Sequence, residues 1–351
     1  MLNGGLIQST GKRRNAEGNG GAGLVQKYVA QRLILTIPTL FMVTLLTFLF
    51  LRVFLPADVI DLIIGEYGRN DPGLRAALEA ELGLSGSLLS QYTNWMGISW
   101  FWGGEAGVLQ GDLGESLHSG RSVVGELQRR VPVSFELGMW ALVTAVIVSV
   151  PMGVWAALRQ DQWPDYGLRS AAILVNSVPS FWIAVLVITF GSIWFNWAPP
   201  INFEYLQDDP WAHFQIMLLP ALIIGITPSG GLVRLVRTQM LEVLRQDYVR
   251  TAHAKGLSQN TVLYRHALRN ALIPVVTVIG SVFLPNIVTG TVIFEQIFII
   301  PGMGRYLVDA VNNLDYPVVQ GLNLVYAVIL LGCLIAVDIS YAFLDPRIRF
   351  R

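Results

Sequence analysis

The chain has 351 residues, of which 53% are apolar and only 14% are charged, against about 25% charged residues in ordinary soluble domains. This balance indicates an integral membrane protein and excludes an ordinary soluble enzyme. Basic and acidic residues are equal at 24 each, so no bulk field favours a nucleic-acid partner. The single cysteine, Cys333, excludes an intrachain disulfide and a cysteine-rich metal site.

The N-terminal part combines a polar tail with a first apolar run. Residues 1–27 are rich in glycine and polar residues, and we expect a disordered cytoplasmic tail. Residues 28–52 are expected to form the first transmembrane helix, since 33–51 contain no Asp, Glu, Lys or Arg. No small-residue cleavage site follows this run, so it is interpreted as a span and not as a signal peptide.

Residues 53–133 are expected to form an extracytoplasmic segment that is too long for a simple connection. One helix is predicted between Asp71, a candidate N-cap, and Gly83, a candidate C-terminal stop. A second is predicted over residues 122–131, whose apolar and charged sides suit a helix lying in the membrane interface. The alternative is an ordinary helix packed on its own domain.

Residues 134–346 carry five more uncharged runs, each long enough to cross about 30 Å of hydrocarbon at 1.5 Å per residue. Together with the first run they predict an all-α polytopic membrane protein with six transmembrane helices. Pro179 and Pro285 are expected to kink their helices. The five runs, of which the second is longer than one span needs, are residues 137–158, 170–203, 214–233, 270–294 and 317–337.

The distribution of lysine and arginine predicts the orientation. Five basic residues precede the first span, seven lie between the fourth and fifth, and three follow the sixth. Residues 196–213 contain none, and residues 295–316 contain only Arg305. Both termini, including residues 347–351, and the loop 234–270 are therefore expected in the cytoplasm.

No catalytic, cofactor or metal motif is present: a nucleotide-binding P-loop and paired metal-ligand spacings are both missing. The uncharged spans also lack the ionisable groups typical of ion-coupled carriers. An external energy source is the natural inference, so we do not expect an enzyme. Polar residues within the spans either line a transport path or form hydrogen bonds between helices. The path candidates are Asn176, Ser177, Asn286 and Asn323.

The loop 234–270 is predicted to be helix, elbow and helix. A helix over residues 232–250 extends the fourth span, and a short helix over 248–255 ends at Gly256, a good left-handed cap. Ser258 is expected to cap the next helix. Small residues at 252, 254 and 256 leave room for a partner surface. The alternative is a solvated basic turn that merely obeys the positive-inside rule.

The stretch YVRTAHAKGLSQNTVLYRHALRNALIP resembles the coupling loop of the dipeptide/oligopeptide/nickel permease family of ABC importers, in its B-type branch. Further blocks agree in order, including FEQIFIIPGMGRYLVDAVNNLDYPVVQG and LDPRIR, so that the resemblance covers roughly residues 28–349. Arg250 and Thr251 stand where the general pattern has Glu and Ala, and Arg269 stands where many members have Pro. Gly256 is retained.

The resemblance implies the type I ABC importer permease fold with an extracytoplasmic insert between helices 1 and 2, in the cytoplasmic (inner) membrane of a prokaryote. Implied partners are a second homologous permease subunit, two ABC ATPases that hydrolyse the ATP, an extracytoplasmic substrate-binding protein and the lipid bilayer. Segments 52–133 and 295–316 would meet the binding protein. ATPase coupling is assigned to Arg250, Thr251, Ala252, His253, Ala254, Lys255 and Gly256.

Peptides are the expected cargo. Nickel or glutathione imported by the same architecture stays open as an alternative, as does a carrier or channel that works without an ATPase.

Overall fold

The structure, a computed structural model, describes residues 30–54, 73, 86–283 and 290–344. These residues are mostly helical and contain no strand. The expected tails, the helix between Asp71 and Gly83, the kink at Pro285 and the path candidate Asn286 lie outside the described residues. The all-α prediction is confirmed for the part of the chain that the structure describes.

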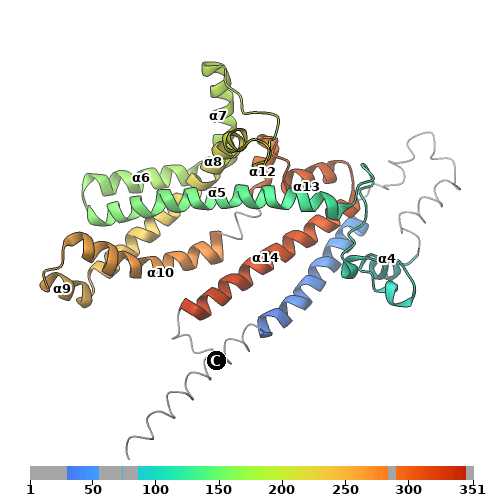
Figure 1. Cartoon of the computed structure of the whole chain (residues 1–351), viewed down its shortest axis with the longest axis horizontal. Helices are drawn as coiled ribbons and strands as arrows, with labels where there is room; N and C mark the ends of the chain where they lie inside the picture. The colour runs from blue at the N-terminus through green and yellow to red at the C-terminus, as the bar shows by residue number, and fades with distance from the viewer. Residues whose placement is uncertain (1–29, 55–72, 74–85, 284–289, 345–351) are drawn as a thin grey trace, which may run out of the picture.

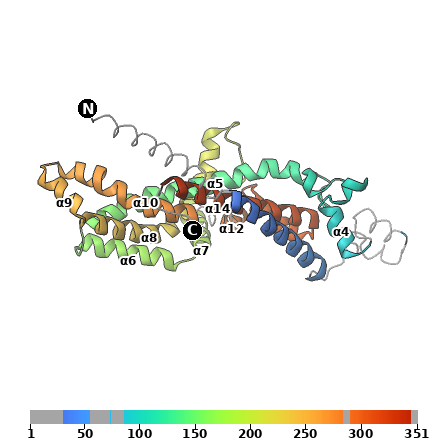
Figure 2. The same ribbon diagram turned by 90° about the horizontal axis from the view of Figure 1, so that it is seen from below.

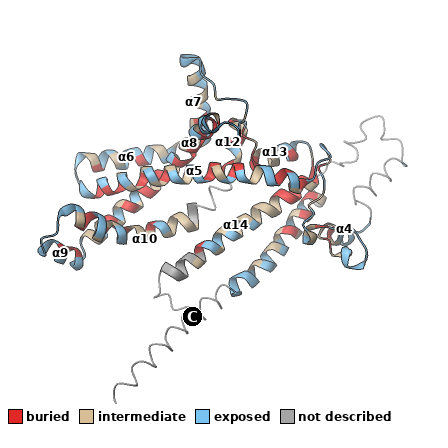
Figure 3. Cartoon of the chain, viewed as in Figure 1, coloured by how far each residue is buried: buried red, intermediate tan, exposed pale blue. Residues whose placement is uncertain are grey.

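Among the described residues, four helices are long and apolar enough to span a membrane: Ala30–Arg52, α5 (Val123–Leu158), α8 (Pro210–Leu244) and Tyr316–Val337 of α14 (Tyr316–Leu344). A bent pair, α6 (Trp163–Ser177) and α7 (Ser180–Phe195), counts as a fifth if it forms one span. The helix Ala30–Arg52 is mostly exposed, with 11% of its most apolar window buried (Figure 3).

The expected span over residues 270–294 is not among these helices. Its described residues belong to α10 (Arg269–Val278), to a π-helix that follows directly (Ile279–Phe283) and to α12 (Val292–Ile297), and residues 284–289 lie outside the described part. The described residues therefore carry up to five of the six expected spans.

The centre of the molecule is the parallel pair α5 and α8, which lie against each other because small residues face the contact. A Cβ on Gly225 of α8 would collide with the carbonyl oxygen of Ala141 in α5, and one on Gly153 of α5 would lie 2.6 Å from Val236 Cβ. Small residues that let helix backbones approach closely are typical of membrane helix contacts.

The long uncharged run over residues 170–203 is broken, and the kink predicted at Pro179 is confirmed. Val178 is extended, with φ −105° and ψ 127°, as expected for a residue before proline. Helices α6 and α7 then meet at 89°, and Figure 1 shows α7 leaving the layer in which α5 and α6 lie. Helix α6 runs back along α8 in the opposite direction.

The helix predicted over residues 122–131 is present, but it is the beginning of α5 and continues without interruption into the second span. The Ser122 side chain caps it by accepting from Gly125 N at 3.5 Å. Val123 and Leu127 are buried in a cluster with Met303, Tyr316 and Leu322. The structure therefore supports the alternative, a helix packed on its own protein.

Segment 86–122, which contains α4 (Leu88–Trp95), is held to the chain after α13 (Met303–Asn312) by Asp315. The buried Asp315 carboxylate accepts from Ser116 Oγ at 2.6 Å and from Leu117 N at 3.1 Å. Figure 1 shows α4 and α13 towards one end of the molecule and α9 (Asp247–Ala254) at the other, and Figure 2 shows α4 and α9 at opposite ends again.

Candidate coupling site

Helix α9 lies beyond the end of α8, where the sequence predicted the elbow. The extension of α8 is confirmed but ends at Leu244, earlier than the expected residue 250. Arg245 and Gln246 form the turn, and Gln246 is extended with φ −73° and ψ 147°. The predicted short helix is confirmed within one residue at each end.

One face of α9 packs on its own chain. Val249 is 1% exposed and Ala252 is 6% exposed, and both pack with Val262 against Val243 and Leu244 at the end of α8. Their three-residue spacing places them on the same side of the helix. Ala252, which was assigned to the coupling set, therefore faces the chain's own core, where its small side chain lets α9 lie close to α8.

The opposite face of α9 is free in this chain. The other six coupling candidates are exposed: Arg250, Thr251, His253, Ala254, Lys255 and Gly256. Thr251 Oγ1 donates to Asp247 O at 2.9 Å, and His253 Nδ1 lies 3.0 Å from Val249 O. The Arg250 and Lys255 side chains are exposed, and Arg250 Nη1 lies 3.7 Å from Asp247 Oδ1.

Gly256 forms the elbow with φ +76°, as its sequence position predicted. Its N–H bonds to His253 O at 2.9 Å, and Leu257 N bonds to Ala252 O at 3.4 Å. A Cβ at this position would meet no atom of the chain within 4 Å, so the backbone torsion alone favours glycine. Ser258 Oγ accepts from Thr261 N at 3.4 Å and caps the following turn, as expected.

An ion pair joins the helix that carries α9 to its neighbour. Arg237 of α8 donates from Nε to Asp165 Oδ1 and from Nη2 to Asp165 Oδ2, both at 2.6 Å. Asp161 N donates to the same carboxylate at 3.1 Å. The sequence indicates Arg237 only as one of the basic residues of the cytoplasmic loop. Asp165 lies in the first turn of α6, but the sequence gives no sign that it pairs with Arg237, because the two residues are 72 positions apart.

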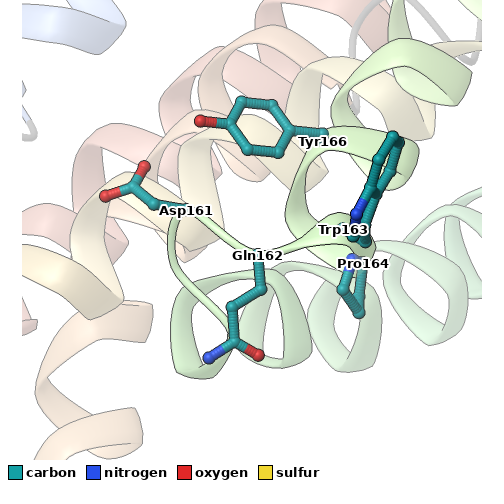
Figure 4. A pocket seen from close by; sticks show the side chains of 5 residues that line it. All are labelled: Asp161, Gln162, Trp163, Pro164 and Tyr166. Atoms are coloured by element: carbon teal, nitrogen blue, oxygen red, sulfur yellow. The ribbon is translucent and has the colours of Figure 1, made fainter.

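A pocket of about 640 Å³ lies beside this pair at the turn between α5 and α6 (Figure 4). Its lining residues are Asp161, Gln162, Trp163, Pro164 and Tyr166. The Trp163 ring is 88% exposed. The ionisable groups of this lining are the Asp161 carboxylate and the Tyr166 phenol. Among the described residues, no group of three His, Cys, Asp or Glu side chains could hold a metal ion.

Comparison with known proteins identifies the chain's family. The profile described as "Binding-protein-dependent transport system inner membrane component" matches residues 149–350, and its companion for the N-terminal region matches residues 25–138. The chain belongs to this family. It is therefore an integral inner-membrane permease component of a transport system, as the coupling-loop resemblance predicted.

Curated relatives extend over nearly the whole permease. A putative peptide transport system permease protein of Brucella abortus (strain 2308) is 38% identical over 327 residues, covering 93% of this chain and 99% of the relative. The dipeptide transport system permease protein DppB of Bacillus subtilis is 38% identical, with 92% and 98% covered. DppB of Escherichia coli K12 is 37% identical, with 93% and 99% covered.

The path candidates of the permease differ in their surroundings. Asn176, with its amide oriented to satisfy its neighbours, donates to Thr227 O at 2.7 Å and accepts from Gly231 N at 3.3 Å. Ser177 Oγ donates within its own helix to Ile173 O at 2.8 Å. Asn323 is half-buried in α14. Asn176 thus forms hydrogen bonds between helices, which was the alternative to lining the transport path. Path lining stays a prediction for every path candidate.

The sequence did not indicate the hydrogen-bond partners of two buried polar side chains in the permease. Glu295 is fully buried and accepts from Ser134 Oγ at 2.7 Å, Thr291 Oγ1 at 2.8 Å and Arg305 N at 3.0 Å. His213 is 3% exposed, with Nε2 2.9 Å from Glu136 Oε1. Both groups bring α5 into contact with the segments that follow α7 or α10, and no local pattern announces such contacts.

Proposed function

We propose that this permease imports di- or oligopeptides and is driven by ABC ATPases that bind the exposed face of α9. The observation that carries the coupling part is the two-sided α9. One side is buried against α8, and the rest of the elbow presents five exposed residues and the exposed, left-handed Gly256. The peptide part is supported by relatives whose names describe peptide or dipeptide transport permeases.

The proposed orientation places the α9 end in the cytoplasm and the α13 end outside. Lysine and arginine counts support it, because the loop 234–270 holds seven basic residues. A sixth span would pass through residues 270–294. Segments 86–122 and 295–316 would receive the substrate-binding protein, and a second homologous permease would complete the path.

Coupling through α9 is tested with variants of Gly256. Asn and Asp tolerate the left-handed region better than other residues, and a side chain at Gly256 meets nothing in the chain itself. We expect Gly256→Asp and Gly256→Asn to keep normal membrane levels but to lower ATP-driven uptake at least about tenfold, since they block the ATPase's approach. Full uptake by Gly256→Asp would refute the proposal.

Gly120 offers a matched control for backbone cost. It has φ +64° and, like Gly256, no atom within 4 Å of a built Cβ. Gly120→Asn should therefore change thermal stability as little as Gly256→Asn does. A stability loss confined to Gly256→Asn would assign its defect to folding and not to ATPase contact.

Partners and cargo are tested together by mild-detergent purification of the tagged chain and reconstitution in liposomes. We expect two P-loop ATPases and a second permease to be recovered, and uptake to require ATP, the binding protein and a peptide. Uptake of nickel or glutathione in place of peptides would overturn the cargo assignment. Transport by the chain alone without ATP would overturn the importer assignment.

A further inference from the structure

One turn of α8 is weakened by its own sequence. Pro228 has no N–H, so it cannot donate to the carbonyl of Ile224, and Gly230 and Gly231 follow it. Thr227 Oγ1 donates to Ile223 O at 2.9 Å, and Ser229 Oγ donates to Ile226 O at 2.5 Å. Side-chain bonds of this kind compete with the helix ladder and often bend helices. Residues 223–231 are thus a part of α8 in which the helical ladder is weakened.

A side chain from α6 supports this turn. Asn176 donates to Thr227 O and accepts from Gly231 N, at 2.7 and 3.3 Å. Because these two groups are four residues apart, they are the partners of one rung in the α-helical ladder. The amide of Asn176 therefore binds both ends of that rung.

Gly230 makes the approach possible. A Cβ at Gly230 would lie 2.5 Å from Ala172 O and 2.9 Å from one terminal amide atom of Asn176, whereas a Cβ at Gly231 would meet nothing within 4 Å. The two neighbouring glycines thus differ in one respect that an experiment can use. Only Gly230 must lack a side chain for α6 to lie this close to α8.

The supported turn of α8 lies beside a second break. Helix α6 ends at Ser177, one residue after Asn176, and α7 departs at 89°. On one side of the two breaks, α6 and the second half of α8 are joined by Asp165 and Arg237 and carry α9. On the other side, Ala184 of α7 packs with Ile216 and Met217 of α8 in another cluster.

We propose that Asn176 is the positioning residue of a joint between these two bodies. The joint consists of residues 176–180 and 223–231. The Asn176 amide holds α8 straight across its weak turn, so that a displacement of α9 reaches the α7 body instead of being lost as bending within α8. This inference rests on the proposed coupling through α9 and adds the place where the movement is transmitted.

The test compares ATP hydrolysis with peptide uptake in the complete reconstituted transporter. For Asn176→Leu we expect uptake to fall at least about tenfold while ATP hydrolysis stays within about twofold, so that more ATP is consumed per peptide. Hydrogen exchange should increase within residues 223–232. The control Ser281→Ala removes a local bond from the π-helix to Thr277 O of α10, four residues earlier, at 2.9 Å, and should change neither quantity more than about twofold.

The glycine pair gives a second, independent measurement. Gly230→Ala should raise ATP consumption per peptide as Asn176→Leu does, and Gly231→Ala should leave it within about twofold of the unmodified transporter. This pair decides the matter if Asn176→Leu does not assemble. The proposal is overturned if Asn176→Leu keeps the ATP-to-peptide ratio, if uptake and hydrolysis fall in proportion, or if both glycine variants behave alike.

Failure of the joint and failure of α9 coupling are distinguishable. An unchanged ratio in Asn176→Leu, together with loss of uptake in Gly256→Asp, would remove the joint and keep the coupling. Full uptake in Gly256→Asp would remove the coupling, and the joint with it.

Discussion

Arg237 holds Asp165 with two parallel hydrogen bonds of 2.6 Å each, across 72 residues of sequence. The Asp165 side chain is 0% exposed and that of Arg237 is 16% exposed. A planar guanidinium matches a carboxylate in this two-bond arrangement, which fixes orientation as well as distance. The pair therefore binds α6 rigidly to the half of α8 that leads to α9.

Breaking this pair should be costly. Asp165→Asn leaves the partly buried Arg237 without its counter-charge, and we expect a loss of about 3–5 kcal/mol in the free energy of unfolding. Thermal denaturation of the purified chain in detergent measures it. The exposed pair Arg250–Asp247, 3.7 Å apart, is the control, because screened surface pairs contribute little. If Asp247→Asn lowers stability as much as Asp165→Asn, the argument from burial is wrong.

Glu295→Gln should destabilise the contact between α5 and the segment around α12. The carboxylate accepts three hydrogen bonds, and an amide in its place would direct N–H groups at donors. We expect about 1–3 kcal/mol of lost stability from thermal denaturation. Asp309→Asn serves as the control, since Asp309 is 51% exposed and 3.9 Å from Arg305. A Glu295→Gln variant as stable as this control would contradict the assigned bonds.

Asp315→Ala should release segment 86–122 from the region after α13. The change removes the acceptor of Ser116 Oγ and Leu117 N, which lie 199 and 198 residues away in sequence. We expect protease cleavage within residues 98–121 to become several-fold faster, as local opening requires less free energy. Glu105→Gln, a change at an exposed acid of the same segment, should leave the rate unchanged. Equal rates in both variants would show that Asp315 is not the attachment.

Tyr306 predicts an alkaline effect on stability. Burial, with the nearby charges of Asp315 and Glu126, raises the pKa of the Tyr306 phenol to about 12 from its ordinary value of 10.0. Between these values the unfolded chain loses the phenolic proton and the folded chain keeps it. The stability contributed below pH 10 is therefore lost as the pH rises towards 12.

Tyr306→Phe should remove that part of the alkaline loss. Its ring can still lie under the Arg130 guanidinium, whose Cζ is 4.3 Å from the ring centroid. The hydroxyl that is removed has no hydrogen-bond partner in the described part of the chain. We expect equal or higher stability at pH 8, and a smaller fall between pH 8 and 11 than in the unmodified chain. An equal loss of stability between pH 8 and 11 in Tyr306→Phe and in the unmodified chain would contradict the assigned pKa.

Sequence alone determined the features that depend on neighbouring residues. Uncharged runs predicted the helix Ala30–Arg52, α5, α8 and α14, because a spanning backbone must satisfy its hydrogen bonds internally and expose apolar side chains. Pro179 predicted the break because proline excludes the helical conformation before it. The spacing of apolar residues, Gly256 and Ser258 predicted α9, its elbow and the next cap within one residue. Six of the seven coupling candidates are exposed, and their contact with an ATPase stays a prediction.

The tertiary structure decided which residues of different helices of the permease contact one another. The packing of α6, α8 and α9 determines three contacts. Ala252 faces inward, Arg237 pairs with Asp165, and Asn176 binds α8. The helix starting at Val123 joins the second span because its apolar side meets residues after 300. Hydropathy reports how much a residue avoids water. It does not report which distant surface covers that residue, because the free energy of burial is the same for any apolar partner.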